Sequence, residues 1–182
     1  MGPRFVRLAA VFYGLLVVAA AVWCGLRGMD LPVLGARPAT GLLLGLATAA
    51  GTVSLSLLAY RLIPVTRKLA EELAPTIVDG TDRAGLALLA LFSGVGEEVF
   101  FRGAVQQEFG IVIASVVFGL AHVGPDRRFL LWTVWAIVAG LVFGVLFEST
   151  GGLLAPVTAH AAHNAATLLI WKRSRGRGLG PQ

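Results

Sequence analysis

Three ionisable side chains stand close together inside a long apolar run of this chain. The stretch GEEVFFRG, residues 96–103, holds Glu97, Glu98 and Arg102. Each of these side chains costs on the order of 3 kcal/mol at the centre of a membrane-spanning helix, so their presence needs a reason. Carboxylates in a low-dielectric setting can hold a proton or deprotonate water, which is general acid and base chemistry.

Helical spacing gives the two carboxylates different surroundings. Glu98 and Arg102 are four residues apart, with the acid on the N-terminal side, so they share a face and can neutralise each other as a structural pair. Glu97 points about 100° away, onto the stripe of Ser93 and Phe101, and has no partner within its own helix. We expect Glu97 to take up a proton or to meet a polar group from another helix. An intramembrane ionisable residue of this kind is a functional hypothesis by default.

All three histidines of the chain lie in or at the ends of apolar segments. His122 follows Phe118 by four residues, so the phenyl ring can pack against the imidazole. In HAAHNAA, Asn164 shares a face with His160, and His163 leans to the same side. A lone histidine on an apolar face is usually a satisfied core residue. Three of them, with an unpaired glutamate and an asparagine, indicate a site.

Glu97, His122, His160 and Asn164 would together supply the groups of an amide hydrolase. The carboxylate and an imidazole can hold and deprotonate water, and the remaining donors can stabilise an oxyanion. Such a site needs water, so we expect a polar cavity that is open to one side of the membrane. The depth of His122 agrees least with that of Glu97, because His122 ends a short apolar segment. Either that helix is displaced or the site tilts toward that face.

The apolar segments that must carry these residues account for nearly the whole chain. Of the 182 residues, 57% are hydrophobic and only 14% are charged, which is outside the range of soluble globular domains. We predict an all-α, polytopic membrane bundle of six transmembrane helices, forming a single domain over residues 1–182 with its catalytic core at 84–171. The expected spans are 8–25, 41–60, 84–106, 129–147 and 153–171, with 111–123 as a shorter sixth.

Positive charge is distributed unevenly between the two sides of these spans. If the N-terminus is cytoplasmic, the inside segments hold twelve Lys and Arg residues and the outside loops hold Arg27 and Arg37. This bias predicts a multi-pass protein of the cell membrane with both termini cytoplasmic. The membrane topology then explains the formal charge of +5, and this charge gives no reason to expect a nucleic-acid partner. The charged stretch 61–78 predicts a further helix at the cytoplasmic interface. The twelve are Arg4, Arg7, Arg61, Arg67, Lys68, Arg83, Arg127, Arg128, Lys172, Arg173, Arg175 and Arg177.

Three motifs occur in one order along the chain, each within an expected span. They are EExxxR from Glu97 to Arg102, FxxxH from Phe118 to His122 and HxxxN from His160 to Asn164. The set resembles the CAAX prenyl protease and bacteriocin-processing (CPBP) family, whose eukaryotic relatives are the Ras-converting CAAX endopeptidases. The resemblance implies an intramembrane endopeptidase whose partners are the lipid bilayer and a membrane protein or peptide substrate. Bacterial relatives cleave peptide precursors, confer bacteriocin immunity, or trim C-terminal sorting tails as the myxosortases do.

The resemblance also implies roles for individual residues. The first glutamate of the pair and the histidine of the second motif would activate water, while the histidine and asparagine of the third motif would bind the oxyanion. His163 occupies a variable position of the family pattern, and its default role is structural. The catalytic set is Glu97, His122, His160 and Asn164, and the supporting set is Glu98, Arg102, Phe118 and His163.

The family has been described both as metalloproteases and as glutamate-type peptidases. Zinc held by Glu97, His122 and His160, with one position open for water, is therefore one alternative. The chain contains no HExxH motif, and we favour the reaction without a metal cofactor.

Two hypotheses from other classes are compatible with buried ionisable groups. A proton-coupled or ion-coupled transporter would relay protons through Glu97 and the histidines, but it predicts inverted internal repeats, and the sequence shows no such symmetry. A non-catalytic bacteriocin-immunity or chaperone protein would keep the motifs for folding alone.

Overall fold

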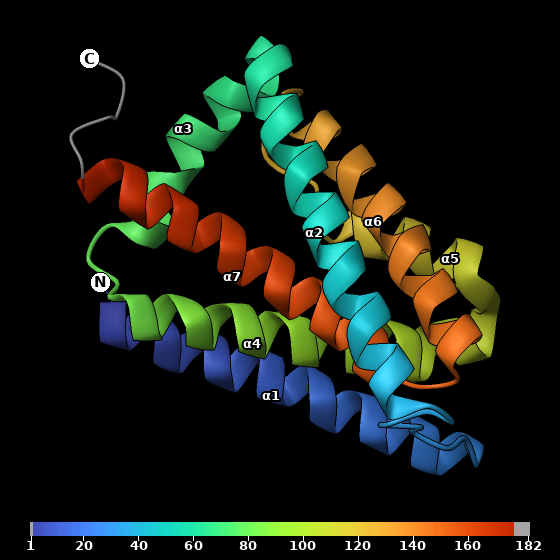
Figure 1. Ribbon diagram of the computed structural model, residues 1–182. Coiled ribbons are helices and arrows are strands. Elements are labelled where there is room, and N and C mark those ends of the chain that lie inside the picture. Colours follow the sequence, from blue (N-terminus) through green and yellow to red (C-terminus); the bar gives the residue numbers. More distant parts are fainter. Residues whose placement is uncertain (1, 177–182) are drawn as a thin grey trace.

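The computed structural model describes residues 2–176, and these residues form an all-helical bundle without strands (Figure 1). This confirms the predicted fold class. The C-terminal end of the basic tail, including Arg177, lies outside the described residues. The elements are α1 Gly2–Arg27, α2 Pro38–Leu62, α3 Pro64–Val78, α4 Arg83–Phe100, the π-helix η1 Phe101–Gln106, α5 Gln107–Leu120, α6 Phe129–Thr150 and α7 Leu154–Gly176.

Within the described residues, four helical segments are long and apolar enough to cross a membrane: Gly2–Arg27, Pro38–Leu62, Arg83–Leu120 and Phe129–Thr150. The expected spans 84–106 and 111–123 are therefore two arms of one bent segment. The expected span 153–171 forms α7, which is helical but is not one of the four. Its two histidines and its asparagine lower its hydropathy, and α7 packs mainly against α2 and α4.

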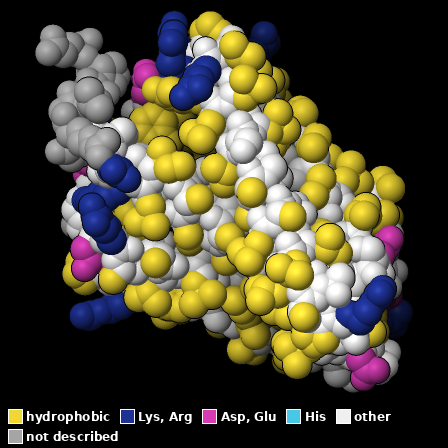
Figure 2. All heavy atoms as spheres, viewed as in Figure 1, with side chains coloured by type: hydrophobic (Ala, Val, Ile, Leu, Met, Phe, Trp, Pro, Cys, Tyr) yellow, Lys and Arg dark blue, Asp and Glu magenta, His cyan; other side chains and the backbone are white. Residues whose placement is uncertain are grey.

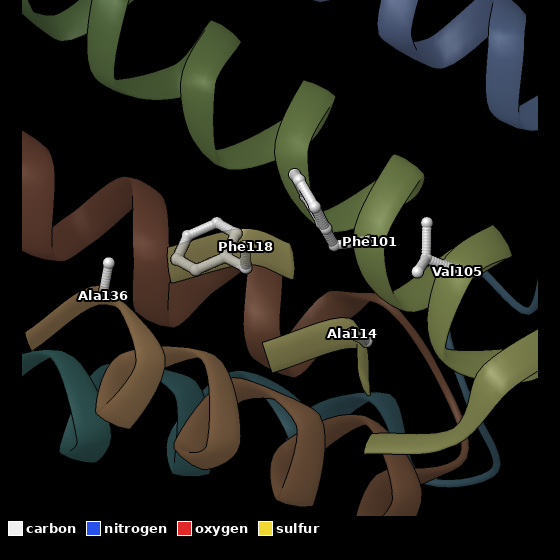
Figure 3. Packing of buried hydrophobic residues seen from close by; sticks show 5 residues of the cluster. All are labelled: Phe101, Val105, Ala114, Phe118 and Ala136. Carbon is white, nitrogen blue, oxygen red and sulfur yellow. The ribbon is translucent and has the colours of Figure 1, made fainter. Parts of the chain in front are cut away.

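The bend between α4 and α5 depends on Gly110. Its φ of 82° and ψ of 166° lie in a region that is essentially open only to glycine. After this residue, α5 folds back against η1 instead of continuing away from it. Figure 3 shows the result, with Phe118 and Ala114 of α5 beside Phe101 and Val105 of η1 in one buried cluster.

Two polar side chains join the π-helix to α6. Arg102 Nη2 donates to Gly140 O at 3.1 Å, and one turn later Gln106 Nε2 donates to Gly144 O, also at 3.1 Å. A side chain at residue 144 would meet Gln106 Oε1 at 2.7 Å, so glycine is needed for this approach. A π-turn is a widened helical turn that often occurs at functional sites. Here it directs two buried polar groups at the backbone of a neighbouring helix.

The surface agrees with a membrane protein. Figure 2 shows hydrophobic side chains over most of one face, with Lys and Arg gathered toward its margins. The helix expected within 61–78 is present as α3, and its residue Glu72 accepts two hydrogen bonds from Arg128 in the loop before α6. Arg175, at the end of α7, pairs with Asp79 just after α3. Ion pairs therefore tie α3 to two other parts of the bundle.

Candidate active site

Glu97 on α4 faces His122, which lies just beyond the C-terminal end of α5. His122 Nε2 is 3.7 Å from Glu97 Oε2. The side chain of Glu97 is 11% exposed and that of His122 is 25% exposed, so the pair is sheltered but reachable. Glu97 Oε2 has no hydrogen-bond partner among the described residues. The carboxylate expected to meet a polar group from another helix does so, at a distance longer than a hydrogen bond.

The imidazole of His122 is oriented by its own helix. His122 Nδ1 is 2.7 Å from Phe118 O, and the ring lies 4.7 Å from the Phe118 ring. Because a carbonyl oxygen only accepts, Nδ1 carries the proton in this contact. In the neutral form of such a ring, Nε2 carries a lone pair and acts as an acceptor. The lone pair faces the Glu97 carboxylate. Two proton acceptors thus converge on one point, which suits them to hold a water molecule by both of its hydrogens.

The bend at Gly110 explains how His122 and Glu97 come together. Glu97 lies 13 residues before Gly110 and His122 lies 12 residues after it. Two helical arms of nearly equal length that fold back at one point bring their ends to the same level. The bend therefore accounts for the meeting of these residues.

The second carboxylate belongs to a separate and fully buried cluster. Arg102 Nε lies 3.1 Å from Glu98 Oε2, and both side chains are 0% exposed, so the expected ion pair forms. His160 Nδ1 of α7 is 2.8 Å from Glu98 Oε1. The guanidinium also lies over the Phe118 ring, 4.8 Å from its centroid. Glu98 therefore connects α4 with α7, and Arg102 extends the cluster to the helix that carries His122.

The remaining polar residues of α7 point in two directions. Asn164 Nδ2 donates to Ser93 Oγ at 2.9 Å, one turn before Glu97 on α4. His163 Nδ1 instead contacts Thr52 Oγ1 of α2 at 3.0 Å. The expectation that His163 leans to the same side as His160 is therefore wrong, because their rings bond to different neighbouring helices. An offset of three residues left room for either direction.

The residues considered as zinc ligands do not form a metal-ligating group in the described part of the chain. Among residues 2–176, no three His, Cys, Asp or Glu side chains are grouped so as to hold a metal ion. Glu97 and His122 approach each other, whereas Nδ1 of His160 is engaged by Glu98. The donor set Glu97, His122 and His160 does not fit zinc as these side chains lie, and we derive no step through a metal.

One residue near Glu97 was missed at the level of sequence. Tyr13 of α1 packs against Gly96, the residue before Glu97 on α4. The signal was present, because Tyr13 is the single polar ring in the apolar run AAVFYGLLVV, but nothing in that run reveals which helix it faces. Only the packing of α1 against α4 supplies that information.

Comparison with known proteins identifies the segment that contains these motifs. Residues 81–166, just under half of the chain, match the family model for type II CAAX prenyl endopeptidase Rce1-like proteins. A curated relative, the uncharacterized protein YpbD of Bacillus subtilis (strain 168), is 34% identical over 75 residues. The matched part is 41% of this chain and 39% of that relative. No solved structure matches the chain significantly.

Proposed function

Because residues 81–166 match the family model for Rce1-like CAAX prenyl endopeptidases, we propose that this integral membrane protein is an intramembrane endopeptidase. Its substrate is a peptide bond in a membrane-associated protein or peptide precursor, such as a C-terminal tail, a sorting signal or a bacteriocin precursor. The observation that carries the proposal is the approach of Glu97 Oε2 and His122 Nε2 to 3.7 Å inside a helical bundle.

Glu97 and His122 activate the water in this proposal. Each presents an acceptor to one hydrogen of the same molecule, which leaves the oxygen lone pairs directed at a scissile carbonyl carbon. When the water oxygen bonds to that carbon, one proton passes to the Glu97 and His122 pair. The pair then returns the proton to the leaving amine as the carbon–nitrogen bond breaks. The acceptors end the cycle as they began it.

His160 and Asn164 bind the developing oxyanion. Nδ1 of His160 is engaged by Glu98, so a protonated ring would present Nε2–H to a substrate oxygen. Asn164 uses one amide hydrogen on Ser93 and has a second to offer. Donors held in place before the reaction stabilise the oxyanion without reorganisation, which is the usual source of the largest catalytic gain.

A hollow of about 300 Å³ follows His122 along the chain, lined by 123–127, Phe129, Leu130 and Thr133. Thr133 Oγ1 donates to His122 O at 3.4 Å, so the hollow adjoins the residue proposed to activate water. None of Glu97, His122, His160 and Asn164 lines this hollow. The positive-inside bias supports a cytoplasmic position for both termini.

The test uses the purified full chain in detergent and measures cleavage of a mixture-based library of internally quenched peptides. Half of these peptides are farnesylated on a cysteine near the C-terminus. Wild type should release fluorescence from a subset, and Glu97→Gln should lower that rate by roughly 10²–10⁴-fold. The farnesylated half shows whether a prenyl group matters. If wild type cleaves none of the library, or if Glu97→Gln cleaves as wild type does, the proposal is wrong.

The same assay decides the metal question. We propose a reaction of the glutamate type, so treatment with EDTA should leave the rate within about twofold. Loss of activity with EDTA, followed by recovery on addition of zinc, would replace this proposal with a metallopeptidase whose ligands rearrange from the positions described above.

A further inference from the structure

Tyr13 is the side chain that α1 brings to the candidate site. It lies in the middle of a helix that also carries exposed apolar side chains, among them Phe12, Leu15 and Val18. Tyr13 is half-buried, because it faces α4. The helix that carries it precedes the segment that matches the Rce1-like family, which begins at residue 81.

The approach of Tyr13 to α4 depends on Gly96. A Cβ atom at residue 96 would lie 2.7 Å from Tyr13 Cβ, 3.0 Å from its Cδ1 and 3.0 Å from its carbonyl oxygen. A larger residue at this position would therefore push α1 away, since backbone as well as side-chain atoms are in contact. Glu97 is the next residue along α4. The missing side chain at Gly96 thus brings Tyr13 beside the residue that carries the candidate carboxylate.

The Glu97 carboxylate needs a donor to fix its direction. Its Oε2 is buried without a hydrogen-bond partner among the described residues, and His122 Nε2 stands 3.7 Å away, beyond hydrogen-bond distance. A phenolic hydroxyl donates one hydrogen and lies on a ring with few rotatable bonds, so it can fix a carboxylate at small entropic cost.

We propose that Tyr13 is a positioning residue of the candidate active site, whose hydroxyl donates to Glu97 and holds that carboxylate in line with His122. This inference rests on the proposed endopeptidase function. It assigns α1 a part in the reaction, although α1 contains none of the three motifs. Tyr13 acts through Glu97 and does not itself contact the scissile bond.

The chain offers a matched control. The second of its two tyrosines, Tyr60, donates to Glu71 Oε1 at 2.9 Å, away from Glu97. With the quenched peptide that wild type cleaves fastest, Tyr13→Phe should lower kcat about tenfold and leave KM within twofold. Tyr60→Phe should leave both constants unchanged. Equal kcat values for Tyr13→Phe and wild type would overturn the inference and leave the endopeptidase proposal intact.

A second measurement does not depend on activity. Thermal unfolding midpoints in detergent are compared for wild type, Tyr13→Phe, Glu97→Leu and the double variant. Tyr13→Phe should lower the midpoint in the presence of Glu97 and should have no effect in the Glu97→Leu background. The same shift in both backgrounds would mean that the hydroxyl does not interact with Glu97, and the inference would be wrong even if the library assay succeeds. Failure of wild type to cleave any peptide would count against the endopeptidase function alone.

Discussion

Glu97 and Glu98 are adjacent in the sequence, yet they occupy opposite kinds of surroundings. Glu98 is 0% exposed and is held on both oxygens, by Arg102 on one side and His160 on the other. Glu97 is partly accessible, and its closest ionisable neighbour on another helix stands 3.7 Å away. One carboxylate is held by two ionisable partners, and the other faces an imidazole beyond hydrogen-bond distance.

The difference teaches how a helix can place a reactive group in an apolar bundle. The buried cluster around Glu98 joins α4 to α6 and α7 through side-chain contacts, so the backbone beside Glu97 is constrained. The cluster fixes the position of Glu97 along α4, and a donor is then needed only to fix the direction of its carboxylate. An ion-paired buried cluster therefore stands next to a carboxylate without an ion-pair partner in its own helix, and the two kinds of surroundings separate at a single peptide bond.

The sharpest test of this contrast exchanges each carboxylate for an amide. Glu98→Gln leaves the Arg102 charge buried without a counter-charge and should lower the free energy of unfolding by about 3–5 kcal/mol. Glu97→Gln removes an unpaired buried charge and should leave that free energy the same or raise it. Thermal or denaturant unfolding of both purified variants measures the difference. Equal destabilisation by the two changes would remove the distinction between the residues.

A change at the bend should affect the Glu97 side more than the Glu98 side. Gly110→Ala forces a side chain into a positive-φ conformation, which costs roughly 1–3 kcal/mol and shifts the arm that carries His122. A displacement near 1 Å can lower a rate by about 10²-fold. Gly51→Ala is the control, because Gly51 lies in regular helix with open space around it. Comparable rates for these two variants would show that the bend does not position His122.

Substitution of the two histidines of α7 should also have different effects, on stability for one and on the cleavage rate for the other. His163→Ala loses the contact with Thr52 and should reduce stability by about 1 kcal/mol while the peptide cleavage rate stays within twofold. His160→Ala removes a group that Glu98 holds in place and should lower the rate by more than about 10²-fold. Steady-state kinetics and unfolding midpoints on both variants provide the comparison. A large rate loss for His163→Ala would move that residue into the site.

The smallest expected effect concerns the loop before α6. The side-chain hydrogen bonds from Arg128 hold the pKa of the Asp126 carboxyl below its usual range. A lowered folded-state pKa contributes stability above the unfolded value, near 3.9, and that contribution is lost as the pH falls through the folded value. The unfolding midpoint of wild type should therefore exceed that of Asp126→Asn slightly at pH 7. The gap should close below about pH 4. A gap independent of pH would exclude this ion pair as its cause.

The sequence predicts the helices and the pair of Glu98 with Arg102 well, because both depend on local pattern. The length of the apolar runs located the helices, and the spacing of four between Glu98 and Arg102 predicted their pair. Contacts between helices are predicted less well. The engagement of Glu98 by His160, the turn of His163 toward Thr52 and the approach of Tyr13 to Gly96 all depend on how helices pack, which no pattern within one helix encodes.

The bend at Gly110 has a consequence for how the chain can change length. Each residue added to one helical arm would lift its end by about 1.5 Å and turn it by about 100°, so an insertion between Glu97 and Gly110 alone would separate that carboxylate from His122. A matched insertion in the opposite arm would restore the level but would also have to restore the rotation. Tolerated insertions and deletions should therefore fall outside residues 97–122, in the loops that join the other helices.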